Sequence, residues 1–128
     1  APEELLTKIS IKPWGMPYGY GFQEFARRHG DFAIAAVGCL LKLQDGVISE
    51  IAISIGGVED IPRRFIECED VLRGSKYDIE EVKKQIIGPL DQINYIDDSL
   101  VTGSYRQKLL KGLLVRSIEQ AASRANSL

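Results

Sequence analysis

Residues 27–57 read RRHGDFAIAAVGCLLKLQDGVISEIAISIGG, and this stretch decides the fold. Its two apolar runs are joined by Asp45-Gly46, a dipeptide that favours a two-residue hairpin because both turn positions need positive φ. We therefore predict a long antiparallel hairpin. On the second run, alternation predicts a buried face made of Val47, Ser49, Ile51, Ile53 and Ile55.

The first run of the hairpin, residues 32–43, is apolar at nearly every position before Lys42. A strand that is apolar on both faces is normally central, with a strand or a helix covering each side. We therefore expect the rest of the chain to pack on this hairpin.

Size and composition narrow the class of protein. A chain of 128 residues forms one domain, and its net charge of −2 without a basic stripe argues against a nucleic-acid partner.

No apolar run approaches the roughly 20 residues that span a bilayer, and the first residues lack the pattern of a secretory signal, so we predict a cytoplasmic protein without a membrane partner. Cys39 and Cys68 lie in unrelated contexts without metal-ligand spacing, so no metal site is predicted.

The segment before the hairpin leaves alternatives open. Residues 4–11 alternate as a short strand would, and Pro13 should end it. The next residues form a loop rich in glycine and proline, and its rings Trp14, Tyr18 and Tyr20 either close the edge of the core or face a planar ligand or a partner subunit. Residues 22–28 fit a helix and a strand about equally well.

Helices are predicted after the hairpin. One spans about 63–73, and a second spans about 78–87, capped by Asp78 with Glu81 and stopped by Gly88-Pro89. The clearest helix spans about 104–123 and begins with a Ser104/Gln107 capping box. The residues alone thus predict an α+β domain.

Residues that carry chemistry are sparse. His29 beside Gly30 is typical of a turn, and the adjacent Asp97-Asp98 pair should face water in a loop. Gly56-Gly57 lacks the pattern of a phosphate loop. No self-contained active site is predicted.

Four segments occur in an order that resembles a known family: RRHGDFAIAAVG, ISIGGVEDIPRR, ECEDVLRG and YRQKLLKGLLVRSIEQA. Together they resemble the C-terminal domain of the FAD-binding, or medium, subunit of molybdenum hydroxylases, the family of xanthine dehydrogenases and aerobic carbon monoxide dehydrogenases. The resemblance covers about residues 21–122 and implies a strand at 20–28. It therefore favours a three-stranded antiparallel sheet, about 20–28, 32–43 and 47–55, covered by the three helices.

The same resemblance divides the chain and implies a function. Residues 1–20 correspond to the final strand and linker of a preceding FAD-binding domain, and residues 21–128 to the C-terminal domain of the medium subunit. Such a domain completes the FAD site and docks neighbouring subunits, while electrons pass from [2Fe–2S] clusters to FAD. FAD would be shared with an N-terminal domain, whereas molybdopterin and the [2Fe–2S] clusters would belong to partner subunits. The domain would be part of an oxidoreductase without being catalytic alone.

The resemblance also implies three flavin-contacting residues. Leu6 matches an apolar position that touches the flavin, and Phe22 matches an aromatic near the isoalloxazine ring in some members. Gln23 matches a position where other members place a lysine, so it keeps hydrogen-bonding ability without the charge.

Two other functions compete with the flavin role. The domain could be a free-standing protein-interaction module, docking through its aromatic loop at residues 14–20 and self-associating as a homo-oligomer at an exposed sheet face. A small independent enzyme would depend on His29 and Asp97-Asp98 alone, and we do not favour it.

Overall fold

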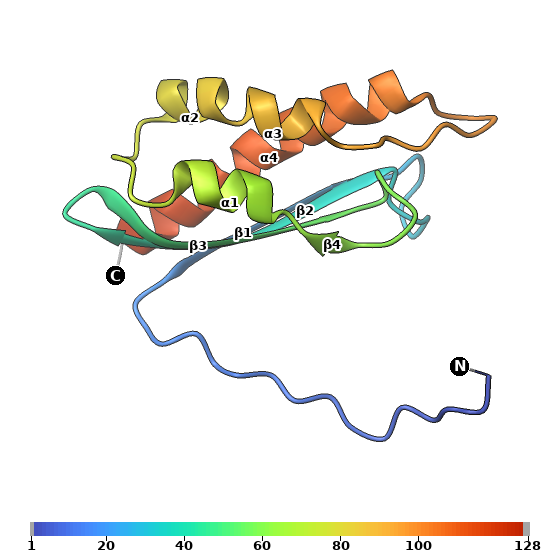
Figure 1. The fold of residues 1–128 in the computed structure, drawn as a ribbon, viewed down its shortest axis with the longest axis horizontal. Helices are drawn as coiled ribbons and strands as arrows, with labels where there is room; N and C mark the ends of the chain where they lie inside the picture. Colours follow the sequence, from blue (N-terminus) through green and yellow to red (C-terminus); the bar gives the residue numbers. More distant parts are fainter. Residues whose placement is uncertain (1, 127–128) are drawn as a thin grey trace.

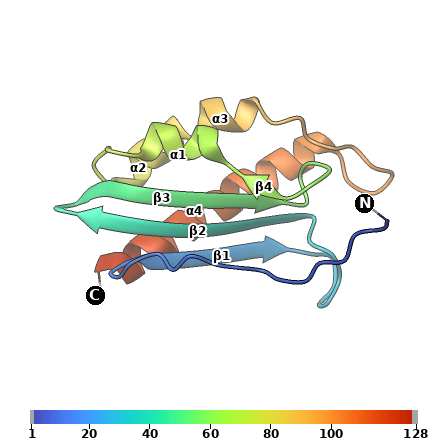
Figure 2. The ribbon, with the colours of Figure 1, turned by 60° about the horizontal axis from the view of Figure 1, so that its bottom comes forward.

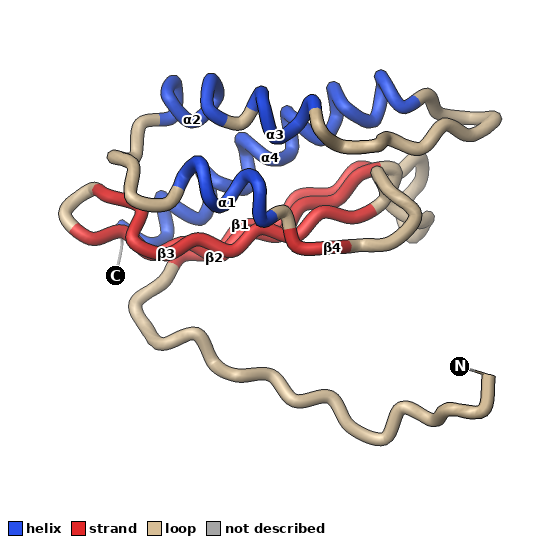
Figure 3. Tube along the Cα trace, in the orientation of Figure 1, coloured by secondary structure: helices blue, strands red, loops and turns tan. Residues whose placement is uncertain are grey.

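The computed structural model describes residues 2–126 and has two layers. An antiparallel sheet forms one layer in the order β1-β2-β3-β4 (Figure 2). The helices lie together on one face of the sheet, and the segment before β1 runs past the other face (Figure 1). Figure 3 shows that this segment is irregular up to the start of β1. The elements are β1 (Gly19–Phe25), β2 (Ala35–Gln44), β3 (Val47–Gly56), β4 (Arg63–Arg64), α1 (Ile66–Leu72), α2 (Ile79–Gln85), α3 (Ile87–Asp91) and α4 (Gly103–Asn126).

The predicted hairpin is confirmed. Asp45 and Gly46 both have positive φ, at 53° and 74°, and Gln44 pairs with Val47 across the turn. The register shifts by one residue between Lys42 and Leu43, which leaves Ser49 as the extra residue of a β-bulge.

This bulge corrects the predicted alternation near the turn. A bulge moves the residues before it to the other face, so Ile48 is fully buried, whereas Val47 is only half-buried. Beyond the bulge, Ile51, Ile53 and Ile55 are buried as predicted.

The central strand β2 is covered on one side only. Ala35, Val37, Cys39 and Leu41 face the helices and are buried, whereas the residues between them are half-exposed. The prediction that both sides of this strand are covered is therefore wrong for the described residues. The apolar residues of the second face lie at a surface.

The sheet has four strands, not the three that we predicted. Arg63 and Arg64 pair with Ile55 and Ser54 as β4, so the helix predicted at about 63–73 begins only at Ile66. Of residues 22–28, which fitted a helix and a strand equally well, residues 22–25 belong to strand β1 (Gly19–Phe25), so the strand predicted at about 20–28 ends three residues early. Residues 4–11 form no strand, because the described chain places no neighbouring strand beside them.

The start of α2 was predicted correctly, whereas the end of the helical region was not. Asp78 caps α2 by accepting from the backbone N–H groups of Glu80 and Glu81, as predicted. Gly88-Pro89 does not end the helical region, because Pro89 is the third residue of α3, where the first turn needs no N–H from it.

The long helix α4 begins one residue earlier than predicted and has a different cap. The Oγ1 atom of Thr102 accepts from the N–H of Tyr105, and Asp97 accepts from the N–H of Gly103. Gln107 donates to Asp91 instead of completing a capping box with Ser104. Among residues 2–126, neither α4 nor another helix has the length and apolar character required to cross a bilayer.

Candidate functional site

The sheet face opposite the helices is the first candidate site. We call it the open sheet face and define it by the side chains that alternate away from the helix layer: Tyr20, Phe22, Glu24, Ala36, Gly38, Leu40, Lys42, Glu50, Ala52 and Ser54. Phe22 is its most prominent ring, with 59% of its surface exposed. Ala36, Gly38 and Leu40 lie beside this ring on β2, and Tyr20 and Glu24 flank it on β1, so the surface next to it is apolar apart from Glu24.

Gly38 keeps this surface flat next to Phe22. The two residues are paired across β1 and β2, and a Cβ atom at Gly38 would lie 2.9 Å from the Oγ of Ser54 and 4.0 Å from the Phe22 ring. A side chain at this position would therefore fill the space beside the ring. This space suits the face of a planar ligand.

The strand that carries Phe22 is fixed by α4. The backbone N–H of Phe22 donates to Oε1 of Gln120 at 3.0 Å, and Arg124 donates to the carbonyl of Tyr20 at 2.7 Å while its guanidinium lies 4.0 Å from the Tyr20 ring centroid. These bonds use the outer edge of β1, which would otherwise expose free backbone groups. Phe22 is thus presented on a strand held along its edge.

Two glycines permit this close approach of strand and helix. A Cβ atom would lie 1.7 Å from the carbonyl oxygen of Ala121 at Gly19, and 2.0 Å from that of Ser117 at Gly21. Both values are far below any real contact, so only glycine fits at either position.

The structure does not bring the three predicted flavin residues together. Gln23 follows Phe22 on β1 and therefore points toward the helix side, where its Nε2 lies 3.5 Å from Oε1 of Gln120. Leu6 lies in the irregular segment before β1 and is 76% exposed. Their roles at a flavin stay predictions.

The aromatic residues of the preceding loop lie at the surface. Trp14 and Tyr18 are half-exposed and pack edge to face, with ring centroids 6.1 Å apart. Nζ of Lys42 lies 5.3 Å from the Trp14 ring centroid and also pairs with Glu50. These rings are outside the buried core, so the alternative in which they close the core edge does not hold.

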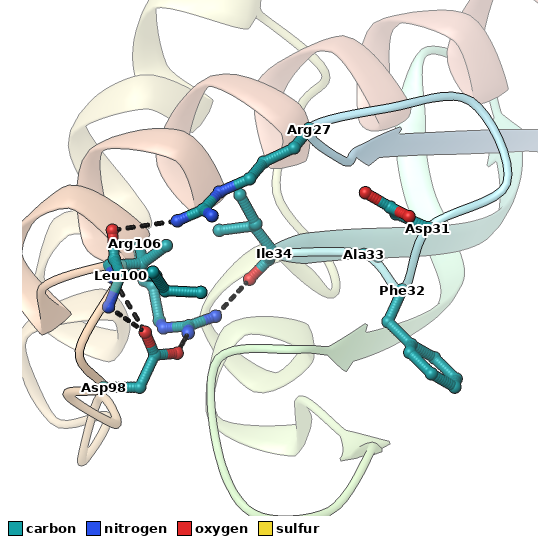
Figure 4. A pocket seen from close by; sticks show the side chains of 9 residues that line it. Arg27, Asp31, Phe32, Ala33, Ile34, Asp98, Leu100 and Arg106 are labelled. Carbon is teal, nitrogen blue, oxygen red and sulfur yellow. Dashed lines mark hydrogen bonds and ion pairs between the residues drawn. The ribbon is translucent and has the colours of Figure 1, made fainter.

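The second candidate site is a hollow of about 340 Å³ at the end of the sheet (Figure 4). Phe32 at its rim is fully exposed, and Arg27 donates to the carbonyl of Leu100 at 3.1 Å. Arg106, 5% exposed, forms its floor and connects distant segments by donating to the carbonyls of Ile34, Gly57 and Ile96 and pairing with Asp98.

The acidic pair in this loop has a structural role that we did not predict. Asp98 accepts from the N–H groups of Leu100 and Val101, and these bonds, followed by the Arg106 charge, lower the pKa of its carboxyl. Asp97 caps α4, so the pair does not simply face water. The carboxylates order the loop instead of forming an acid/base pair.

The other candidate chemical groups remain separate. His29 is exposed. Burial raises the pKa of the Cys39 and Cys68 thiols to about 12, so both are protonated near neutral pH. Within residues 2–126, no three metal-ligating side chains gather at one place.

The open sheet face fits part of a flavin site. A flat, apolar surface with an exposed phenylalanine suits one face of a planar ring such as isoalloxazine. At Gly57, which follows the last residue of β3, the space beside the Cα is filled by the carbonyl oxygens of Ala33 and Ile34, so Gly56-Gly57 offers no cradle for a pyrophosphate. These residues could form a wall of the site, with the phosphates held elsewhere.

A family model and individual relatives all match this chain to the medium, or flavoprotein, subunit of similar enzymes. The family model described as "CO dehydrogenase flavoprotein C-terminal domain" matches residues 20–121. The chain is 34% identical to the nicotine 6-hydroxylase medium subunit of Paenarthrobacter nicotinovorans, over 97% of this chain and 43% of that protein. It is 32% identical to the glyceraldehyde dehydrogenase medium chain of Sulfolobus acidocaldarius, over 93% and 42% respectively.

Solved structures show the same fold. Quinoline 2-oxidoreductase from Pseudomonas putida 86 superposes with a TM-score of 0.76 at 27% identity, over 84% of this chain and 38% of that chain. Reconstituted CO dehydrogenase from Oligotropha carboxidovorans gives 0.77 at 26% identity, with the same coverage. The chain thus spans less than half the length of the relatives that it matches.

Proposed function

Because the chain belongs to the CO dehydrogenase flavoprotein C-terminal domain family, we propose that it completes the FAD site of a molybdenum–iron–sulfur–flavin hydroxylase. In this proposal it docks the neighbouring subunits, while electrons pass from [2Fe–2S] clusters to FAD. The partners are an FAD-binding N-terminal domain and the iron–sulfur and molybdopterin subunits. FAD is shared with that N-terminal domain, and the other cofactors are held by the partner subunits.

The observation that carries the proposal is the exposed ring of Phe22 on the open sheet face. A phenylalanine side chain has roughly 200 Å² of surface, and 59% of it remains in water here. At about 25 cal/mol per Å², covering that area with a planar ring would contribute up to about 3 kcal/mol. Covering the Phe22 ring with a ligand would therefore contribute measurably to the free energy of binding.

Residues 1–20 suit the role of a strand and linker that belong to the preceding FAD-binding domain. Leu5, Leu6, Ile9 and Ile11 are all strongly exposed, although their side chains are apolar. A strand needs a neighbouring backbone, which the described part of this chain does not provide. Pairing within an FAD-binding domain would cover these side chains and bring Leu6 to the flavin.

The test is a flavin titration, followed by fluorescence, of the full chain alone and mixed with the FAD-binding domain of a related medium subunit. We expect tighter binding in the mixture than with either part alone. Phe22→Ala should weaken that binding by about tenfold, well below the roughly hundredfold or more that about 3 kcal/mol from complete covering would give. Phe32→Ala is the control, because it removes an even more exposed phenylalanine ring, 101% against 59%, that lies outside the open sheet face.

A second function has separate support. The half-exposed Trp14 and Tyr18 suit a free-standing interaction module, with no flavin role, that docks or self-associates through its aromatic loop. If the mixture binds flavin no better than the added FAD-binding domain alone, the flavin proposal fails. A monomer–dimer equilibrium that Trp14→Ala weakens would then favour the module.

A further inference from the structure

A groove on the helix layer, away from the open sheet face, carries an uncommitted positive charge. It lies along α4 beside α2 and α3, and consists of two adjoining hollows of about 180 and 450 Å³ that share Lys108 and Lys111. Figure 1 shows α2 and α3 running beside α4 on the side of the helix layer away from the sheet. We call it the α4 groove; its lining also includes Lys83, Ile87, Leu90, Asp91, Gln107, Gly112, Val115, Arg116 and Glu119.

The α4 groove is lined by more cationic than acidic side chains, four against two. Within residues 2–126, the side chains of Lys108, Lys111 and Arg116 form no ion pair or hydrogen bond. Asp91 accepts from the neutral amide of Gln107 at 2.9 Å and keeps its negative charge. Glu119 is the other acid in the lining. The groove is thus locally cationic on a chain whose net charge is −2.

Gly112 is an independent indication that another molecule packs against this groove. It lies exposed in the middle of α4, where glycine is less favourable than any residue except proline. A Cβ atom there would meet nothing within 4 Å, in contrast to the blocked positions of Gly19 and Gly21. Packing inside the chain therefore gives no reason for a glycine, whereas close approach of an external backbone does.

We infer that the α4 groove docks an acidic polypeptide segment of a partner protein. Carboxylates of the partner meet Lys108, Lys111 and Arg116, and its backbone rests over Gly112. The half-buried Val115 adds an apolar contact one turn from Lys111. This surface is distinct from the open sheet face, and the inference does not depend on flavin binding.

A polypeptide suits the groove better than a nucleic acid. A continuous line of phosphates would place negative charge directly beside Glu119. The groove is lined by no aromatic side chain on which bases could stack. A segment with spaced carboxylates and small residues between them avoids both problems.

The test uses the full chain and a short labelled peptide of repeated Glu-Ala-Ala-Ala, followed by fluorescence anisotropy at low salt. We expect it to bind at least about tenfold more tightly than the same peptide with Gln in place of Glu. Lys108→Glu should weaken binding by about tenfold or more. Gly112→Leu should weaken it by about fivefold while leaving the thermal midpoint of the chain no lower.

The matched control is Lys84→Glu. Lys84 is exposed on α2 and lines neither hollow, so its reversal makes the same change in net charge outside the groove. Equal weakening by Lys84→Glu and Lys108→Glu would reduce the effect to net charge and overturn the inference. Equal affinity for the Gln peptide, or tighter binding of an oligonucleotide of equal charge, would also overturn it.

Discussion

Replacing Gly21 by alanine should force β1 and α4 apart. The added Cβ would lie 2.0 Å from the carbonyl oxygen of Ser117, and side-chain β-carbons essentially never approach other atoms closer than 3.0 Å. The obstacle is helix backbone and not a flexible side chain, so α4 must recede from β1 by roughly 1 Å or more.

The cost of this displacement has two parts. Overpacking that shifts backbone typically costs about 1–3 kcal/mol. The bond from the N–H of Phe22 to Gln120 depends on the same close approach, and its loss adds about 1 kcal/mol. We predict that Gly21→Ala lowers the free energy of unfolding by about 3 kcal/mol, measured by urea denaturation followed by circular dichroism.

Gly112→Ala is the matched control, because it makes the same chemical change at an open position of α4. It should raise the free energy of unfolding by about 0.5–1 kcal/mol, since alanine is the better helix former. A loss below about 1 kcal/mol for Gly21→Ala, with an unchanged m-value, would refute the close packing of β1 on α4.

Three further changes test the buried polar groups. Arg106→Met should lower the free energy of unfolding by about 3 kcal/mol or more in a urea titration, because three backbone carbonyls lose their donor; a loss under 1 kcal/mol would contradict this. Glu69→Gln should cost about 1–2 kcal/mol by the same measurement, because the neutral side chain loses its charge-assisted bonds from Arg64 while it can still accept from the N–H of Ile53; an unchanged midpoint would argue against the pair. The thiols of Cys39 and Cys68 have their pKa raised by burial from 9.0 to about 12, so the folded chain holds these protons more tightly than the unfolded chain. Stability should therefore fall as pH rises from about 9 toward 12, and the double alanine variant should show a shallower slope in thermal melts over that range; equal slopes would exclude the thiols as the cause.

The sequence predicted those parts of the fold that depend on local patterns. Asp45-Gly46 defined the hairpin, and Asp78 marked the start of α2, because turn and cap chemistry involve residues close together in the chain. The bulge at Ser49 has no such signal, and it moved Ile48 to the buried face. Tertiary pairing likewise made Arg63–Arg64 a strand where local pattern predicted a helix.

The candidate sites depended even more on distant contacts. Arg106 could not be identified from its helix position, because its partners are the backbone carbonyls of residues 34, 57 and 96, which lie far from it in the sequence. The α4 groove combines three unpaired cations with a mid-helix glycine, and only the structure shows that no acid of the described chain forms an ion pair with them. Gly19 and Gly21 offered one usable signal, since glycines two apart on a strand indicate close packing on one face.

The positions of Phe22 and Gln23 constrain where a flavin can lie. Successive residues on a strand point to opposite faces, so a ring lying over the centre of the open sheet face contacts Phe22 and misses the Gln23 side chain. The resemblance to the family implies that Phe22 and Gln23 both contact the flavin. One flavin ring can contact both side chains only if it lies at the outer edge of β1, where Gln120 and Arg124 already form hydrogen bonds with the strand. A flavin at that edge would contact α4 as well as the sheet, so the packing that Gly19 and Gly21 permit would also shape the flavin wall.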